Sequence, residues 1–145
     1  IGQGMHGFTG NRDLQFEDVE KELSEPTDMR IIVIEQAFEK GLTVDRIHEL
    51  TMIDRWFLIK LKNIFDLKNE LEKYSSLENL PIELLRKAKI LGFSDFQITR
   101  HVIKPNPKLT SEISLEVRTH RTKAGIIPYV NQIDTLAAEY PALTN

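Results

Sequence analysis

The chain has 145 residues, of which 41% are hydrophobic and 28% are charged, with a formal net charge of −3. This length and composition are typical of one globular domain and exclude a disordered, collagen-like or repetitive chain. The chain has no cysteine, which excludes a disulfide scaffold, a thiolate metal site and a cysteine nucleophile.

Apolar residues follow a helical period almost throughout, and the residues between them are typical helix caps and stops. The predicted helices cover about residues 16–23, 28–40, 43–50, 55–74, 81–91, 94–103 and 110–124. We place N-caps at Thr27, Asp54 and Ser94, the last with Gln97 in a capping box. The β-branched run 31–34 would also suit a strand, but the capping signals before it and the charged continuation after it favour a helix.

The predicted fold is all-α, with about seven short helices in two clusters followed by an extended C-terminal arm. We take 1–145 as one helical domain, with clusters at about 14–74 and 81–125 joined by a connector at 75–80. Residues 129–145 have no sustained period and are expected to form an arm that leads to a following domain. The side chains expected in the core are Phe38, Phe57, Leu61, Ile64, Phe65, Leu84, Leu85, Leu91 and Ile98.

Charge is distributed unevenly along the chain. Residues 1–85 hold 10 Lys and Arg against 17 Asp and Glu, whereas residues 86–123 hold 9 against 3. Such a basic block could follow a phosphate backbone or dock on an acidic partner, although solvated helix faces are the more common case. The basic block consists of Arg86, Lys87, Lys89, Arg100, Lys104, Lys108, Arg118, Arg121 and Lys123.

No catalytic, cofactor-binding or metal site is predicted in this chain. The glycine-rich start, residues 2–10, lacks the strand and the Lys-Ser/Thr pair of a phosphate-binding loop and is expected to be a flexible lead-in. No histidine has a second one at metal-ligand spacing, and His48 and His101 are expected on solvent-facing helix surfaces. The four histidines are His6, His48, His101 and His120. A Gly-x-Ser-x-Gly nucleophile elbow is also absent from the sequence.

Two short predicted helices joined through Gly92 have the order of a helix-turn-helix motif and fall in the basic block. The second helix would offer only Gln97 and Arg100 to read bases, and Asp95 in its first turn would repel phosphates. A free-standing binding module that uses residues 86–123 for nucleic acid or an acidic protein partner is therefore the alternative hypothesis.

Four segments of the chain carry a resemblance to a known family. They are ELSEPTDMRIIVIEQAFEKG at 22–41, HELTMIDRWFLIKLKNI at 48–64, LLRKAKILGFSDFQI at 84–98 and IDTLAAEYPALTN at 133–145. With these segments in this order, the chain from Phe16 onward resembles the oligomerisation domain of the carbamoyl-phosphate synthetase large subunit. The last segment is more similar to the eukaryotic and fungal members than to the bacterial ones.

This resemblance implies a non-catalytic scaffold segment that links the two ATP-grasp halves of a synthetase. The parent enzyme would make carbamoyl phosphate from bicarbonate, glutamine-derived ammonia and ATP, for arginine or pyrimidine synthesis. Its ATP, with Mg or Mn, would bind outside this segment, which would hold no cofactor. The implied partners are the flanking ATP-grasp domains and further copies of the chain, with no nucleic acid and no membrane, in the cytoplasm or mitochondria. Because the chain does not begin with Met, we expect it to be processed or part of a longer protein.

Overall fold

The computed structural model describes residues 7–9, 14–105 and 110–128. In these residues the regular structure is α-helical, which confirms the predicted all-α fold, and the run 31–34 lies within a helix. The predicted arm, 129–145, lies outside the described residues. The helices are α1 (Val19–Ser24), α2 (Arg30–Glu39), α3 (Val44–Thr51), α4 (Arg55–Leu71), α5 (Ile82–Ile90), α6 (Asp95–Val102) and α7 (Thr110–Lys123).

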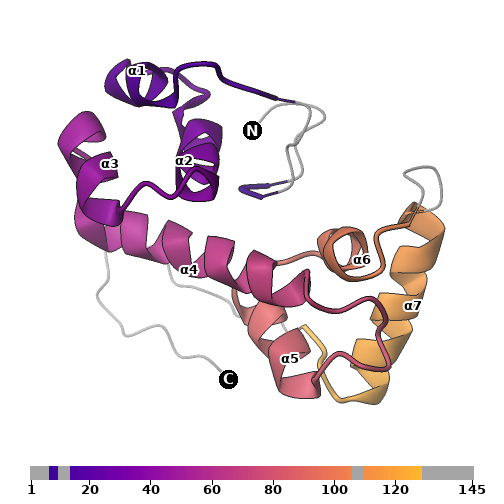
Figure 1. Ribbon diagram of the computed structural model, residues 1–145. Coiled ribbons are helices and arrows are strands. Elements are labelled where there is room, and N and C mark those ends of the chain that lie inside the picture. Colours follow the sequence, from indigo (N-terminus) through magenta and orange to yellow (C-terminus); the bar gives the residue numbers. More distant parts are fainter. Residues whose placement is uncertain (1–6, 10–13, 106–109, 129–145) are drawn as a thin grey trace, which may run out of the picture.

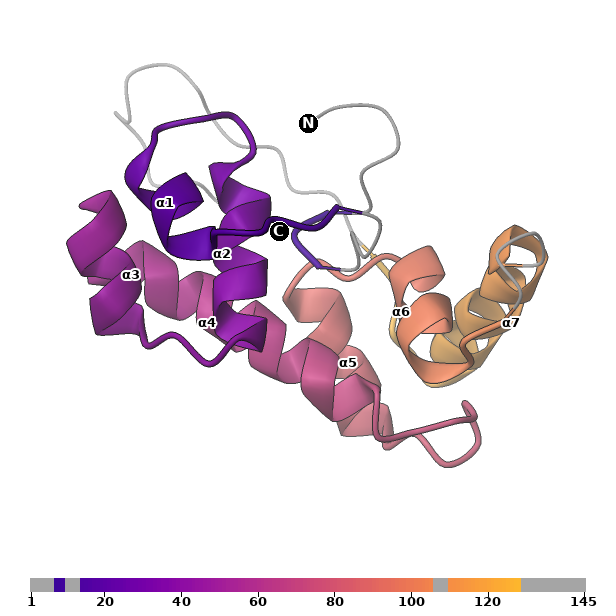
Figure 2. The same ribbon diagram turned by 45° about the horizontal axis from the view of Figure 1, so that its top comes forward.

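The longest of these helices, α4, joins the two halves of the molecule. Helices α1 to α3 gather at its beginning and α5 to α7 toward its other end (Figures 1 and 2). One hydrophobic cluster buries Leu58 and Phe65 of α4 among residues of α1 to α3. The other buries Leu67 and Leu71 of α4 among residues of α5 to α7. The two predicted clusters are thus present and meet within α4, while the limits proposed for the domain and its parts stay predictions.

Side-chain caps explain where α4 and α6 begin. The Asp54 carboxylate accepts a hydrogen bond from the Trp56 amide at 2.7 Å. The Ser94 hydroxyl accepts from the Gln97 amide at 3.1 Å, and the Gln97 side chain accepts from the Ser94 amide at 2.9 Å. These bonds satisfy backbone amides that have no partner within the helix, and they confirm both predicted caps.

The predicted cap at Thr27 is wrong. Helix α2 begins at Arg30, with Met29 in the N-cap position and no side-chain cap. The first helical hydrogen bonds run to the Met29 carbonyl, so residues 27 and 28 belong to a turn before the helix. An N-cap hydroxyl bonds the amide two or three residues ahead of it, and Thr27 therefore lies two residues too early.

Most residues predicted for the core are covered, but Phe57 is not. Leu61, Ile64 and Leu91 are partly buried against the two clusters. Phe57 is 58% exposed, which makes its assignment to the core wrong. Successive helical residues are turned by about 100°, so the neighbouring Leu58 faces the core and directs Phe57 away from it. The fully confirmed core residues are Phe38, Phe65, Leu84, Leu85 and Ile98.

Replacing Ser94 by alanine is expected to lower the free energy of unfolding by about 1 kcal/mol, because the cap of α6 is lost. Chemical denaturation of the purified chain measures this change. Ser75 lies exposed in the connector after α4, and its replacement by alanine is the matched control, with an expected loss within about 0.5 kcal/mol. Equal losses in the two variants would remove the capping role from Ser94.

Candidate functional site

Helix α4 begins with an aromatic pair that faces solvent. The ring centroids of Trp56 and Phe57 lie 4.9 Å apart in an edge-to-face arrangement, and the Lys60 Nζ atom lies 5.0 Å from the Trp56 centroid. Both aromatic side chains are 58% exposed, and Ile59 in the same turn is also exposed. We call Trp56, Phe57 and Ile59 the aromatic face of α4. Large apolar side chains gathered in this way are typical of an interaction surface.

A second feature is the carboxylate of Asp95, in the first turn of α6. The Arg121 Nε donates to both Asp95 oxygens at 3.0 Å, and the Lys89 Nζ donates to Oδ1 at 2.8 Å. Lys89 also donates to the Phe93 carbonyl, and the Arg121 Nη1 donates to the Ile126 carbonyl. Burial alone would raise the pKa of Asp95, but the hydrogen bonds from the two cations outweigh it and lower that pKa below its ordinary value. This cluster ties α5, α6 and α7 together.

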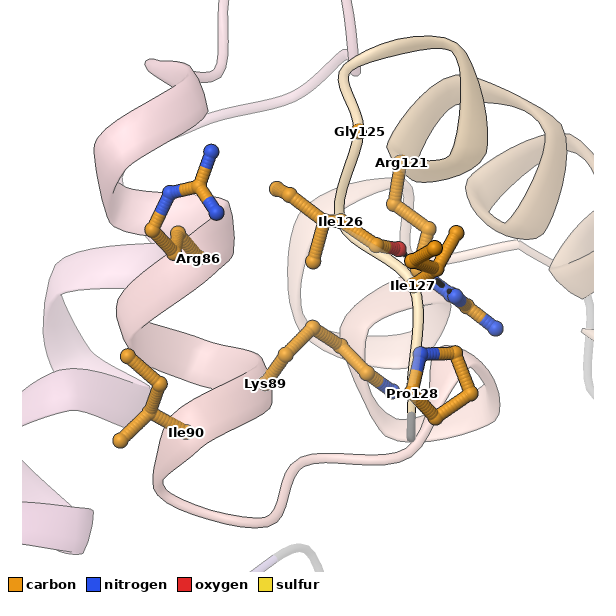
Figure 3. A pocket seen from close by; sticks show the side chains of 8 residues that line it. All are labelled: Arg86, Lys89, Ile90, Arg121, Gly125, Ile126, Ile127 and Pro128. Atoms are coloured by element: carbon orange, nitrogen blue, oxygen red, sulfur yellow. Dashed lines mark hydrogen bonds between the residues drawn. The ribbon is translucent and has the colours of Figure 1, made fainter. Parts of the chain in front are cut away.

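Beside the Asp95 cluster, a pocket of about 520 Å³ opens between α5 and the chain that follows α7 (Figure 3). Arg86, Lys89 and Ile90 line the α5 side, and Ile126 and Ile127 lie opposite them (Figure 3). The remaining lining residues are Arg121, Gly125 and Pro128. The pocket therefore combines cationic groups with apolar walls.

Several cations of the basic block bridge helices in this structure. The Lys87 Nζ lies 3.6 Å from a Glu70 carboxylate oxygen, and the Lys104 Nζ donates to the Glu72 carbonyl at 2.8 Å. Lys89 and Arg121 are bound to Asp95, as described above. The block therefore serves in part to hold α4, α5, α6 and α7 together, and it does not present all its cations as one continuous stripe.

The helix-turn-helix order gains no support from the geometry. Gln97 is used in the α6 capping box, and the Arg100 Nη1 is buried without a hydrogen-bond partner among the described residues. Helix α6 also packs against both α4 and α7, which covers Ile98 and Val102. A recognition helix needs a face free to enter the major groove, and the candidate base-reading residues Gln97 and Arg100 are only partly exposed.

The three described histidines, His48, His101 and His120, lie on three different helices, α3, α6 and α7. His101 is only 3% exposed and its Nδ1 lies 3.0 Å from a Glu72 carboxylate oxygen, so the prediction of a solvent-facing His101 is wrong. Packing of α6 between α4 and α7 covers this side of the helix as well as its apolar side. His48 is half-buried beside the Ile53 carbonyl, and His6 lies outside the described residues. Within residues 7–9, 14–105 and 110–128, no group of three or more His, Asp or Glu could hold a metal ion.

Only residues 7–9 of the glycine-rich start are described, and they are packed against the helices. Thr9 is buried, and a Cβ atom added to Gly7 would lie 2.7 Å from the Gln97 Nε2. These three residues line a small pocket together with Ile64 of α4 and Gln97 of α6, and the expectation of a flexible lead-in stays a prediction. The absence of a catalytic or cofactor-binding residue in the chain stays a prediction.

The comparison with known proteins settles the family. Residues 1–125 match the family described as the carbamoyl-phosphate synthetase large chain, oligomerisation domain. The chain belongs to this family. The predicted resemblance is thereby confirmed. Within the described residues, none of the oligomerisation domain's helices has the length and apolar character needed to cross a membrane.

Individual relatives come from fungi, a slime mould and mammals. The mitochondrial arginine-specific carbamoyl phosphate synthase large chain of Neurospora crassa is 47% identical over 140 residues, which are 96% of this chain and 11% of that protein. The multifunctional protein pyr1-3 of Dictyostelium discoideum is 46% identical over 130 residues, 90% of this chain and 6% of that protein. The mitochondrial carbamoyl-phosphate synthase [ammonia] of Homo sapiens is 40% identical over 146 residues, 97% of this chain and 9% of that protein.

These relatives confirm the likeness to eukaryotic and fungal members. The oligomerisation domain spans about a tenth or less of the length of the N. crassa, D. discoideum and human proteins.

The aromatic face of α4 and the Asp95 cluster were not predicted from the sequence. Two local signals were present: Trp56, Phe57 and Leu58 are consecutive and cannot all face one core, and Lys89 and Asp95 flank the Gly92 turn.

Proposed function

We propose that this oligomerisation domain is a non-catalytic scaffold that joins the two ATP-grasp halves of a carbamoyl-phosphate synthase large chain and packs against them. The aromatic face of α4 carries this proposal, because it leaves two large rings in water. The relatives supply the context, since most of their length lies outside the matched region. In a polypeptide with domains on both sides of this one, a flanking domain would cover the aromatic face.

The size of the aromatic face favours a covalently attached neighbour over a second copy of the chain. A standard interface between separate proteins buries about 800 Å² on each partner. An aromatic side chain contributes about 150–250 Å², so the Trp56 and Phe57 rings with Ile59 supply only part of that area. A flanking domain is held at an effective concentration in the millimolar range, where a smaller contact is sufficient. Contacts between copies of the chain would need additional surface.

The proposed parent enzyme makes carbamoyl phosphate from bicarbonate, glutamine-derived ammonia and ATP. ATP with Mg or Mn would be held by the flanking halves. A role in arginine synthesis and a mitochondrial location are supported by two relatives, which are arginine-specific mitochondrial large chains. We place the parent protein in the cytoplasm or mitochondria. The nucleic-acid alternative has no comparable support, because the cations described above bind carboxylates and carbonyls within the domain.

A graft tests the scaffold proposal. The matched 140 residues of the N. crassa large chain are replaced by this domain, and carbamoyl phosphate synthesis and the hydrodynamic size are measured. We expect the graft to retain both properties. The double variant Trp56→Ala with Phe57→Ala is expected to weaken the docking of the flanking halves by about 30-fold or more, as hot-spot aromatic residues do, and to make the junctions more sensitive to protease.

Leu115 provides the matched control for this graft. It is a large apolar side chain on α7 with 61% exposure, similar to that of the two rings, and it lies outside the aromatic face. Leu115→Ala should leave synthesis and protease resistance unchanged. Thermal unfolding of the domain alone separates docking from folding, since the loss of exposed rings should not change its stability. An inactive wild-type graft would contradict the proposal. Equal effects of the Trp56→Ala/Phe57→Ala double variant and of Leu115→Ala would contradict it as well.

A further inference from the structure

The pocket between α5 and the chain after α7 has the composition of a ligand site that no part of the scaffold role requires. Its volume of about 520 Å³ lies within the range of about 300–1,000 Å³ typical of small-molecule pockets. Among the described residues that line it, Arg86, Lys89 and Arg121 are cationic and none is acidic. Asp95, which lies beside the pocket, offsets one of these three charges. The pocket therefore favours an anion.

Arg86 is the cation of this pocket that is best placed to take a new partner. Its one ion pair among the described residues is with Glu83, and the Arg86 Nε lies 3.8 Å from the Glu83 oxygen, which is too long for a hydrogen bond. The Glu83 side chain is well exposed and that of Arg86 is nearly half exposed, so this pair contributes little to stability. The planar guanidinium keeps the fork of donors that binds a carboxylate or phosphate through two parallel bonds.

The other two cations are fixed in place before any ligand arrives. Lys89 is held by Asp95 and the Phe93 carbonyl, and its aliphatic stem runs across the pocket (Figure 3). Arg121 is held by Asp95 and the Ile126 carbonyl. Their positive field therefore reaches the pocket without a rearrangement of side chains, which lowers the cost of binding.

The apolar walls indicate what the anion carries. Ile90 on α5 is 77% exposed and Ile127 beyond α7 is 64% exposed, although both are large aliphatic side chains. Ile126 also lines the pocket and is part of the second hydrophobic cluster. An apolar group placed here would remove the two exposed isoleucines from water, which is favourable in proportion to the area covered.

We propose that this pocket binds a small anion that carries an apolar body. The carboxylate or phosphate group is bound by Arg86, and the body lies against Ile90, Ile126 and Ile127. Lys89 and Arg121 add positive potential from fixed positions. All residues of the site belong to this domain. The binding test can therefore fail while the scaffold proposal holds, and the reverse is also possible.

Titration of the 145-residue chain with four probes tests the site. Phenyl phosphate and benzoate carry both charge and body, inorganic phosphate lacks the body, and benzyl alcohol lacks the charge. We expect saturable changes in the NMR amide signals of Arg86, Gly125 and Ile127 with the first two probes. Inorganic phosphate and benzyl alcohol should bind at least about tenfold more weakly than these two probes. Tighter binding of phenyl phosphate assigns the site to phosphate esters, and tighter binding of benzoate assigns it to carboxylic acids.

Arg86→Gln should weaken the better probe about tenfold, the loss expected for one charge-assisted hydrogen bond. Lys87→Gln is the matched control, because Lys87 is adjacent on α5 and exposed but pairs with Glu70 and does not line the pocket. Thermal unfolding should be the same for both variants. Equal affinity of wild type and Arg86→Gln, equal losses in the two variants, or signal changes scattered over α1 to α4 would overturn the proposal.

Discussion

Replacing Phe65 by alanine is expected to lower the free energy of unfolding by about 3–5 kcal/mol. The Phe65 ring is only 7% exposed and its centroid lies 5.6 Å from that of Phe38, so α4 and α2 meet through these two rings. The buried Lys68 ammonium lies 5.1 Å from the Phe65 centroid and is paired with Glu39 at 2.6 Å. Removing the ring therefore leaves a cavity beside an ion pair whose lysine is almost fully covered.

Phe57→Ala is the control for this substitution. Phe57 is the same residue type on the same helix, two turns earlier, but it is 58% exposed. Its replacement should change the free energy of unfolding by no more than about 0.5 kcal/mol. Chemical denaturation monitored by circular dichroism measures both variants. A loss below about 1 kcal/mol for Phe65→Ala, or a comparable loss for Phe57→Ala, would mean that the core does not lie where the structure places it.

The contrast between Phe57 and Phe65 shows that the sequence predicts the helix but not which of its side chains are buried. Periodicity and capping signals predict a helix over residues 55–74, which covers the observed α4, because both signals act within a few residues. Which apolar side chains are covered depends on segments distant in the sequence. Phe65 is covered by Phe38 from α2, whereas Phe57 is left mostly exposed to solvent. An apolar helix face inferred from residue spacing alone therefore includes both Phe57 and Phe65.

The Asp95 cluster and the pocket beside it show the same limit for the candidate site. Arg121 lies 26 residues from Asp95, and they meet only because α7 packs against α6. The pocket likewise joins Arg86 to Ile126 and Ile127 from the far end of the described chain. The basic block was visible as composition, but the choice of which cations bind a carboxylate and which remain open is made by packing. His101, buried against Glu72, is a further case.

Replacing Asp95 by alanine is expected to lower the free energy of unfolding by about 2–4 kcal/mol, because Arg121 and Lys89 are left partly buried without their anion. Asp66→Ala is the control, since Asp66 forms an exposed pair with Lys62 on α4 and its loss should cost no more than about 0.5 kcal/mol. A double variant tests whether the loss comes from the contact between Asp95 and Arg121. Adding Arg121→Met to Asp95→Ala should cost less than the sum of the single losses, because the first substitution has already broken their contact.

The pH dependence follows from the lowered pKa of Asp95 in the folded chain. The unfolded chain binds this proton at its ordinary pKa of about 3.9, above the pKa in the folded state. The contribution of Asp95 to stability is therefore fully present above about pH 4 to 5 and is lost as the pH falls through the folded-state pKa. Denaturation midpoints of wild type and Asp95→Asn, measured from pH 7 to pH 3, should consequently converge at the acid end. A gap between them that stays constant over this range would show that the pKa of Asp95 is the same in the folded and the unfolded chain, so that Lys89 and Arg121 do not stabilise its charged form.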